Sequence, residues 1–367
     1  MQIVSLKLKK HSYNIVIGRN AIARLGNILK QLNIGTHAYI ITNSLVKKRF
    51  SRLLLTALSK ARFHAKLRTV PDAERSKSLE IATAVLRDIA KYDRSKRIFV
   101  IAFGGGVIGD LSGFIASIYK RGIPYIQIPT TLLAQVDSSI GGKTAVDLSE
   151  GKNLIGAFYQ PRLVLSEIGF LKTLDSRQLR SGMAEVIKYA AIKDKKLFSY
   201  LERQYRGILG RNSATLEFIV NRCSRIKANI VEKDEREEKG LRTILNFGHT
   251  IGHAIEAASG FKSYNHGEAV ALGMLIETEI SRKLGLIGAL NAERLNRLIA
   301  VTGLPSTIKE ISLGAIIRAH YRDKKFLGKK NRFALLTGIG RAGIIENVPL
   351  DIIRAAVAKR IDTRRTT

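Results

Sequence analysis

The chain has 367 residues, with 62 Lys and Arg against 30 Asp and Glu, so its net charge is +32. A hydrophobic content of 45% argues against a disordered protein, and the single cysteine excludes a disulfide scaffold and fits a reducing compartment. The N-terminus lacks the apolar core of a signal peptide, and no run approaches the ~20 apolar residues of a membrane span. We therefore expect a cytoplasmic, globular protein that does not bind a membrane.

The first half of the chain alternates short β-rich runs with amphipathic stretches. Strands are predicted at residues 38–42, 97–103, 125–129 and 162–165, and helices at 49–63 and 78–92. Such alternation is typical of βαβ units and a mainly parallel sheet. The sequence therefore predicts a Rossmann-like α/β domain over residues 1–175.

After about residue 176 the pattern changes to long helical periodicities. They cover residues 177–204, 213–233, 243–258, 267–284, 290–302 and 350–360. A short β-like pair, at 332–336 and 343–348, interrupts them. We expect a second, mostly α-helical domain over residues 176–367.

The excess of basic residues raises the possibility of a nucleic-acid partner, so its distribution matters. Residues 101–150 hold 3 basic and 4 acidic residues, and residues 251–300 hold 5 of each. These two windows are almost neutral, and they contain the motifs described next. Because an RNA-binding module with paired aromatic residues is not evident in the sequence, we expect no specific nucleic-acid partner.

A glycine-rich turn follows the predicted strand at 97–103. The segment Gly104–Asp110 contains G-x-G-x-x-G, which lets backbone amides approach a pyrophosphate at a helix N-terminus. A ribose-binding acid is missing about 20 residues later, so a tight strand-to-helix turn is the alternative interpretation. Downstream, residues 128–143 and 151–153 are rich in hydroxyls, glycines and lysines, which suits a phosphorylated ligand or an ordinary loop.

Three of the seven histidines fall within eighteen positions of the second neutral window. His249 and His253 are four residues apart and share a helix face, and His266 begins the next predicted helix. Two imidazoles and one carboxylate would form an open Zn²⁺-type site. Spacing alone does not decide which two histidines bind, nor whether the oxygen ligand comes from Glu185, Glu256 or Glu268. Cys223 is expected to lie on a helix and to have a packing role.

Six ordered motifs together resemble the 3-dehydroquinate synthase family. They are GGGVIGDLSGF, IPTTLLAQVDSSIGGKTAVD, GKNLIGAFYQP, GMAEVIKY, LNFGHTIGHAIE and NHGEAVALGM. The resemblance implies conversion of 3-deoxy-D-arabino-heptulosonate 7-phosphate to 3-dehydroquinate and phosphate in the shikimate pathway. The implied steps are transient NAD-dependent oxidation, phosphate elimination, reduction, ring opening and intramolecular aldol closure. A carbon–oxygen lyase that uses NAD and Zn²⁺ or Co²⁺ is the expected enzyme.

The resemblance also implies roles for individual residues. The expected metal ligands are Glu185, His249 and His266. The expected NAD contacts are Asn43, Glu74, Lys77, Gly105, Gly106, Val107, Asp110, Thr130, Thr131, Lys143, Lys152, Phe170, Leu171, Lys172 and Thr173. The expected substrate contacts are Lys143, Asn153, Lys188, Asn246, His253 and Lys325 around the phosphate, Lys227 and Arg242 at the carboxylate, and Asp137 at a hydroxyl. Arg121 is expected to reach the neighbouring site of a homodimer.

Two related functions compete with this interpretation. Other sugar phosphate cyclases, such as 2-deoxy-scyllo-inosose synthase, share the NAD and metal residues but act on substrates without a carboxylate. The pair Lys227 and Arg242 therefore favours dehydroquinate synthase. A metal-dependent polyol dehydrogenase would instead produce NADH in proportion to turnover.

Overall fold

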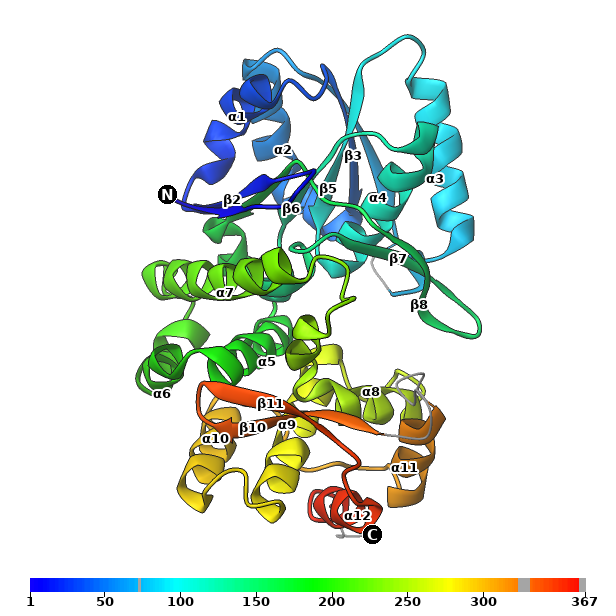
Figure 1. Ribbon diagram of the computed structural model, residues 1–367. Helices are drawn as coiled ribbons and strands as arrows, with labels where there is room; N and C mark the ends of the chain where they lie inside the picture. The colour runs from blue at the N-terminus through cyan, green and yellow to red at the C-terminus, as the bar shows by residue number, and fades with distance from the viewer. Residues whose placement is uncertain (72–73, 323–330, 363–367) are drawn as a thin grey trace. The chain divides into compact units, whose positions relative to one another are not determined.

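The computed structural model of the protein describes residues 1–71, 74–322 and 331–362 (Figure 1). Within these ranges, none of the helices combines the length and the apolar character needed to cross a membrane. The chain divides into two compact units, which are described separately. They comprise Met1–Leu174 with Leu216–Arg236, and Asp175–Thr215 with Glu237–Thr367. The domain limits 1–175 and 176–367 stay a prediction. They do not include the grouping of Leu216–Arg236 with the N-terminal unit.

A seven-stranded sheet forms the centre of the N-terminal unit. Its strand order is β1-β2-β9-β6-β5-β3-β4, with β1 antiparallel to β2 and the other neighbours parallel. The strands are β1 (Gln2–Leu6), β2 (Tyr13–Gly18), β3 (His37–Asn43), β4 (His64–Val70), β5 (Ile98–Gly104), β6 (Tyr125–Pro129) and β9 (Leu163–Glu167). The predicted parallel sheet is confirmed.

Helices cover both faces of this sheet because its central strands are apolar on both sides. In β5, Phe99 and Ile101 pack in the layer that includes α1 (Leu25–Leu32) and α2 (Ser44–Lys60). The alternate residues Val100 and Ala102 pack in the layer that includes α3 (Leu79–Tyr92) and α4 (Gly106–Ile118). Figure 1 shows the two helix pairs on opposite sides of the strands. The glycine turn therefore lies at the carboxyl end of β5, where it connects this strand to the start of α4.

Two further elements belong to the N-terminal unit. Strands β7 (Lys143–Leu148) and β8 (Gly151–Phe158) form a separate antiparallel hairpin. Helix α7 (Ser213–Lys233) contributes most of its length to the same unit. The short helical turns of this unit are η1 (Ala21–Arg24), η2 (Glu74–Ser76), η3 (Tyr119–Arg121), η4 (Ala134–Ser138) and η5 (Ile168–Thr173).

The second unit is mostly helical, as predicted. Its elements are α5 (Ser176–Lys193), α6 (Lys195–Leu209), η6 (Leu241–Asn246), α8 (His249–Ala258), α9 (His266–Lys283), α10 (Ala289–Val301), α11 (Leu313–Arg322), α12 (Leu350–Ala358) and the hairpin β10 (Arg332–Gly338) with β11 (Arg341–Glu346). Helix α9 is buried along most of its length, and its apolar residues join one core with those of α8, α11, α12 and β10. The buried α9 therefore provides a fixed support for the residues at its start.

Two helices that were predicted as continuous are each divided into two helical segments in the structure. The predicted helix at 177–204 breaks at Asp194, whose carboxylate accepts a hydrogen bond from the Leu197 amide at 3.0 Å and caps α6. The predicted helix at 243–258 breaks at Gly248, which has a φ of 81° and lies between η6 and α8. In both cases the break sets the start of a new helix.

Candidate active site

The glycine turn joins β5 to α4, as the sequence predicted. Gly105 is the N-cap residue of α4, and no side chain caps the first turn. A Cβ atom on Gly106 would lie 3.1 Å from the Ser138 hydroxyl oxygen, and one on Gly105 would lie 3.2 Å from a methyl carbon of Thr131. Val107 is half-buried in the first turn of the helix. Uncapped amides and the absence of side chains make this helix start suitable for a phosphate group.

Lys77 joins several of the predicted NAD and substrate residues. Its Nζ lies 2.8 Å from a carboxylate oxygen of Asp110 and also hydrogen bonds to the side-chain oxygen of Asn153. Glu74 lies 3.8 Å from the same Nζ and 3.9 Å from the Nζ of Lys152. Burial would lower the pKa of Lys77, but these carboxylates raise it above its usual value. Lys77 is therefore a buried cation at the centre of this group.

The side chains of some other predicted NAD residues make contacts within the protein itself. The Asn43 side-chain oxygen accepts a hydrogen bond from the Val46 amide at 2.8 Å and caps α2. Phe170 and Leu171 are buried, and the Phe170 ring packs on the rings of Phe50 and Phe103. The Phe170 side chain therefore belongs to the apolar core of this unit. Lys172 and Thr173 are exposed, while Thr130 is buried and Thr131 half-buried.

Asp137 and Lys227 form a close pair inside the N-terminal unit. The Lys227 Nζ lies 2.7 Å from both the carboxylate and the main-chain carbonyl oxygen of Asp137. Asp137 lies in the turn η4, and Lys227 comes from α7. The sequence assigned both residues to the substrate but gave no indication that they contact each other.

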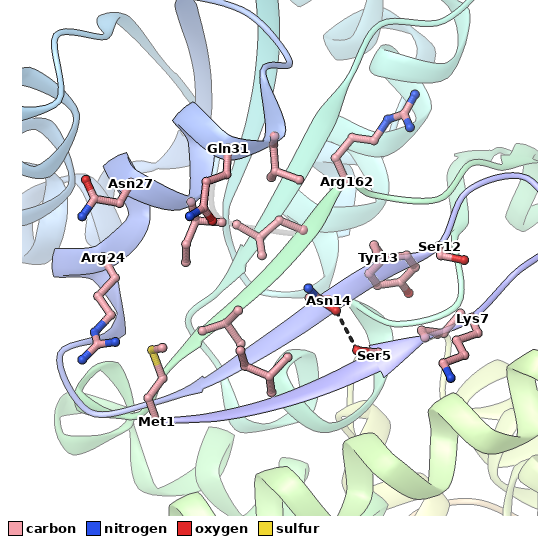
Figure 2. Close-up of a pocket in the computed structure, with 16 residues that line it drawn as sticks. Met1, Ser5, Lys7, Ser12, Tyr13, Asn14, Arg24, Asn27, Gln31 and Arg162 are labelled. Atoms are coloured by element: carbon pink, nitrogen blue, oxygen red, sulfur yellow. Dashed lines mark hydrogen bonds between the residues drawn. The ribbon is translucent and has the colours of Figure 1, made fainter.

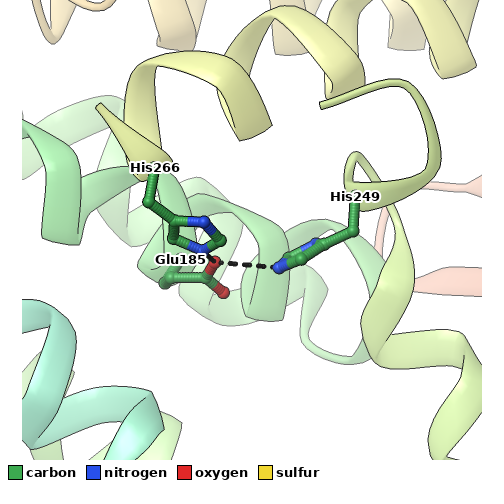
Figure 3. Close-up of side chains that lie close together, drawn as sticks. All are labelled: Glu185, His249 and His266. Atoms are coloured by element: carbon green, nitrogen blue, oxygen red, sulfur yellow. Dashed lines mark hydrogen bonds and ion pairs between the residues drawn. The ribbon is translucent and has the colours of Figure 1, made fainter. Parts of the chain in front are cut away.

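A carboxylate and two imidazoles meet in the second unit (Figure 3). Glu185 of α5 is fully buried, and His249 and His266 are the first residues of α8 and α9. The Glu185 Oε1 atom lies 3.4 Å from His249 Nε2 and 3.2 Å from His266 Nε2. Figure 3 shows the two rings pointing at this carboxylate from separate helices. The structure thus brings together the three residues expected as metal ligands, and their donor types suit Zn²⁺ or a similar divalent cation.

Charges around this group favour an ionised carboxylate. Burial opposes ionisation of Glu185, but Lys188 and the histidines hold the pKa of its carboxyl well below the usual range. Lys188 is itself buried, with its Nζ 2.5 Å from Glu185 Oε2. Burial, together with Lys188, lowers the pKa of His249. Burial would also lower the pKa of His266, but Glu185 and Glu256 raise it to about 10. Glu185 is thus ionised, the form in which a carboxylate binds a metal.

The remaining acids near the histidines have different positions. Glu268 caps its own helix and receives two hydrogen bonds of 2.7 Å from Arg177, so its carboxylate is occupied. Glu256 lies on the other side of His266 and forms a second group with it and His253. Glu277, which the sequence did not indicate, is fully buried, and its carboxylate accepts hydrogen bonds from the Gly248 and Ile251 amides at the start of α8. The sequence signal that could have identified Glu277 is an acidic residue within an otherwise apolar helical segment.

Other predicted substrate residues of the second unit lie on α8 or in η6. His253 is one turn after His249, with ring centroids 5.4 Å apart. Arg242 is buried in η6, and its Nε lies 3.3 Å from a Glu237 carboxylate oxygen. Asn246 ends the same turn.

In the N-terminal unit, Lys143 starts β7 and is exposed. Arg121 follows Lys120 in η3, and both have positive φ angles, 64° and 48°. Lys325 lies outside the described residues.

A separate cavity of about 650 Å³ lies between the β1–β2 hairpin and α1 (Figure 2). Arg24, Lys7 and Arg162 line it together with amides and apolar side chains. Among the described residues that line it, none is a predicted site residue. The cavity is therefore distinct from the predicted catalytic groups.

Comparisons with known proteins cover nearly the whole chain. Residues 67–181 match the family profile described as 3-dehydroquinate synthase N-terminal, and residues 182–326 match 3-dehydroquinate synthase C-terminal. The 3-dehydroquinate synthase of Desulforamulus reducens is 42% identical over 350 residues, which are 95% of this chain and 97% of that protein.

Two solved structures have the same fold. The 2-epi-5-epi-valiolone synthase ValA from Streptomyces hygroscopicus, with NAD⁺ and Zn²⁺ bound, is 28% identical with a TM-score of 0.87, covering 96% of this chain and 98% of that one. A 2-deoxy-scyllo-inosose synthase is 24% identical with a TM-score of 0.89, covering 98% and 100%. The fold predicted from the sequence is confirmed. The profile matches and the identity over almost the full length place this chain in the 3-dehydroquinate synthase family.

Proposed function

We propose that this protein is a lyase that converts 3-deoxy-D-arabino-heptulosonate 7-phosphate to 3-dehydroquinate and phosphate, using NAD and a divalent cation. The observation that carries the proposal is the convergence of Glu185, His249 and His266 within a chain that is 42% identical to a 3-dehydroquinate synthase. Family membership supports the reaction, and the donor set supports the cation.

The three ligands leave coordination positions open for a substrate, as catalytic zinc sites do. Phe247 supports this assignment, because its carbonyl oxygen lies 3.2 Å from His249 Nδ1 and leaves Nε2 for the cation. Zn²⁺ or Co²⁺ fits one carboxylate and two imidazoles. When bound, NAD and the cation supply a transient oxidation of the substrate and polarisation of its hydroxyls.

For NAD, we assign the pyrophosphate to the start of α4. Two features support this position: no side chain caps the amides after Gly105, and Gly106 has no side chain to block the approach of a phosphate. ValA, which is 28% identical, binds NAD⁺. Lys77, Glu74 and Lys152 then lie among the groups that bind and orient the cofactor.

For the substrate, we assign its two anionic ends to the buried cations of the site. Lys188 balances Glu185 and also offers a positive charge to the phosphate. Arg242, paired with Glu237, suits a carboxylate because a guanidinium binds one through two parallel hydrogen bonds. Lys227, held by Asp137 in the N-terminal unit, is the other residue that the family resemblance assigns to the carboxylate. Holding both ends of a flexible substrate favours the intended cyclisation.

We also propose a homodimer in which Arg121 reaches the neighbouring site. The successive positive φ angles of Lys120 and Arg121 support a fixed, strained loop, of the kind that occurs at functional positions. A cytoplasmic location stays a prediction.

The test is release of inorganic phosphate from the heptulosonate phosphate. We expect release to require both NAD⁺ and a divalent cation, to be lost with a chelator, and to fall by orders of magnitude in His249→Ala. No NADH should accumulate, which separates a cyclase from a polyol dehydrogenase. Full turnover by metal-stripped protein would refute the metal site, and turnover of a substrate without a carboxylate would indicate a different cyclase.

A further inference from the structure

The two histidines of the metal group are held in related ways. Each directs Nε2 towards Glu185, and each has an acceptor near its other ring nitrogen, Nδ1. For His249 that acceptor is the carbonyl oxygen of Phe247, at 3.2 Å. For His266 it is the Oε1 atom of Glu256, at 3.7 Å. The second acceptor is a charged side chain, which can be changed by substitution.

We propose that Glu256 is a positioning residue that holds the Nδ1 proton of His266, so that Nε2 is the nitrogen that gives up its proton and binds the cation. The inference rests on the metal site of the proposed function. An imidazole that binds through one nitrogen normally carries its proton on the other, and an acceptor at that proton fixes the orientation of the ring. Glu256 acts through His266.

Burial and charge support this role. The Glu256 side chain is only 10% exposed, so its charge acts in a poorly screened environment. A distance of 3.7 Å is that of an ion pair, longer than a direct hydrogen bond. The negative charge of Glu256 therefore stabilises a proton on the nitrogen that it faces, Nδ1. Glu185 lies at the opposite ring nitrogen, so the two carboxylates flank the ring of His266.

A second interpretation assigns Glu256 to a cation site of its own. His253, Glu256 and His266 offer ligand atoms within 4.8 Å of one another. For both cations to bind, His266 would have to bridge them and carry no proton on either nitrogen. In the first interpretation the cation displaces only the Nε2 proton and His266 keeps its Nδ1 proton, as a metal-bound imidazole normally does, and we therefore favour it. The two differ in the number of cations bound per chain.

The experiment measures Zn²⁺ affinity and stoichiometry in the full-length protein. Metal-stripped wild type, Glu256→Gln and Glu256→Ala are titrated with Zn²⁺ against a chromogenic chelator, and bound zinc is counted by atomic absorption. Loss of such an outer carboxylate typically weakens metal binding about 10–100-fold. We expect a loss in this range for Glu256→Ala, a smaller loss for Glu256→Gln, whose amide oxygen can still accept a hydrogen bond, and one zinc per chain throughout.

Glu279→Gln is the matched control. Glu279 is similarly buried, with 7% of its side chain exposed, but its partners are Arg282 and Lys359. We expect its zinc affinity to stay within twofold of wild type. Thermal unfolding of the metal-free proteins shows whether a variant is folded, and the Co²⁺ absorption spectrum reports the ligand geometry independently of activity.

The outcomes separate the two proposals. Unchanged zinc affinity in a folded Glu256→Ala protein overturns the positioning role while leaving the proposed function intact. A fall from two zinc ions to one identifies Glu256 as a direct ligand and also overturns it. If wild type binds no divalent cation, the metal site of the proposed function fails, and the inference fails with it.

Discussion

Replacing Gly273 with alanine should damage the metal site without touching a ligand. Gly273 lies inside α9, where an added Cβ would be 1.9 Å from the carbonyl oxygen of Gly248 and 2.8 Å from the amide nitrogen of Gly252. Gly248 directly precedes His249, the first residue of α8. The substitution therefore acts where α9 packs directly on the backbone at the start of α8.

The size of the effect follows from this distance. Ordinary contacts of a Cβ begin at 3.4 Å, so the 1.9 Å contact requires the helices to separate by about 1.5 Å. Overpacking of this kind costs about 1–3 kcal/mol, and a backbone oxygen cannot move aside as a flexible side chain can, so we expect about 3 kcal/mol. Metal–ligand distances tolerate changes of only about 0.2 Å. Zinc affinity should therefore fall on the order of 100-fold or more.

Urea unfolding and zinc titration measure the two effects on Gly273→Ala. The control is Gly338→Ala, in the same unit, because a Cβ at Gly338 meets no atom within 4 Å. The control should keep wild-type stability within about 0.5 kcal/mol and wild-type zinc affinity. If Gly273→Ala binds zinc as tightly as wild type, the claim that helix contact positions His249 is wrong.

Three other predictions concern buried charges and the thiol. Lys77→Met should destabilise the N-terminal unit by about 3 kcal/mol because it leaves Asp110 without its cation. Adding Asp110→Asn should recover most of this loss in urea unfolding, and a double variant no more stable than the single one would contradict the reasoning. Glu279 has its pKa lowered from 4.5 to about 2, chiefly by Arg282, so it stabilises the fold above pH 4.5 and that contribution disappears as the pH falls towards 2. Because the Arg282 side chain is 43% exposed, the contribution is about 1 kcal/mol, and the pH dependence of unfolding should flatten by that amount in Glu279→Gln. Cys223 is fully buried, so a thiol reagent should modify it only at the rate of unfolding, and rapid labelling of native protein would contradict its burial.

The sequence predicted those parts of the fold that depend on local patterns. Apolar runs such as β5 and the glycines after it indicate a buried strand followed by a tight turn, whatever the rest of the chain does. The hairpin of β7 and β8 was missed because most of its residues are exposed or half-buried, so its sequence has the polar character of a loop. Strand β4 was missed for a similar reason, since it lies at the edge of the sheet and all of its residues but the last are exposed or half-buried.

The candidate site shows the same limit. Spacing placed His249 and His253 on one helix, and the resemblance supplied Glu185 and His266, which the structure brings together. Contacts between distant segments had no local signal. Glu277 caps α8 from the middle of α9, a relation that depends entirely on how the two helices pack.

The path of α7 has a consequence for how the protein is made. This helix starts in one compact unit, at Ser213, and continues in the other from Leu216 onwards. During synthesis the first 174 residues therefore emerge without one of the helices they pack with, and residues 175–215 must be made before it follows. Asp137 meets Lys227 only at that stage. The N-terminal unit can therefore be complete only after residues 175–215 of the other unit have been synthesised, and a fragment ending at residue 175 would lack part of its own structure.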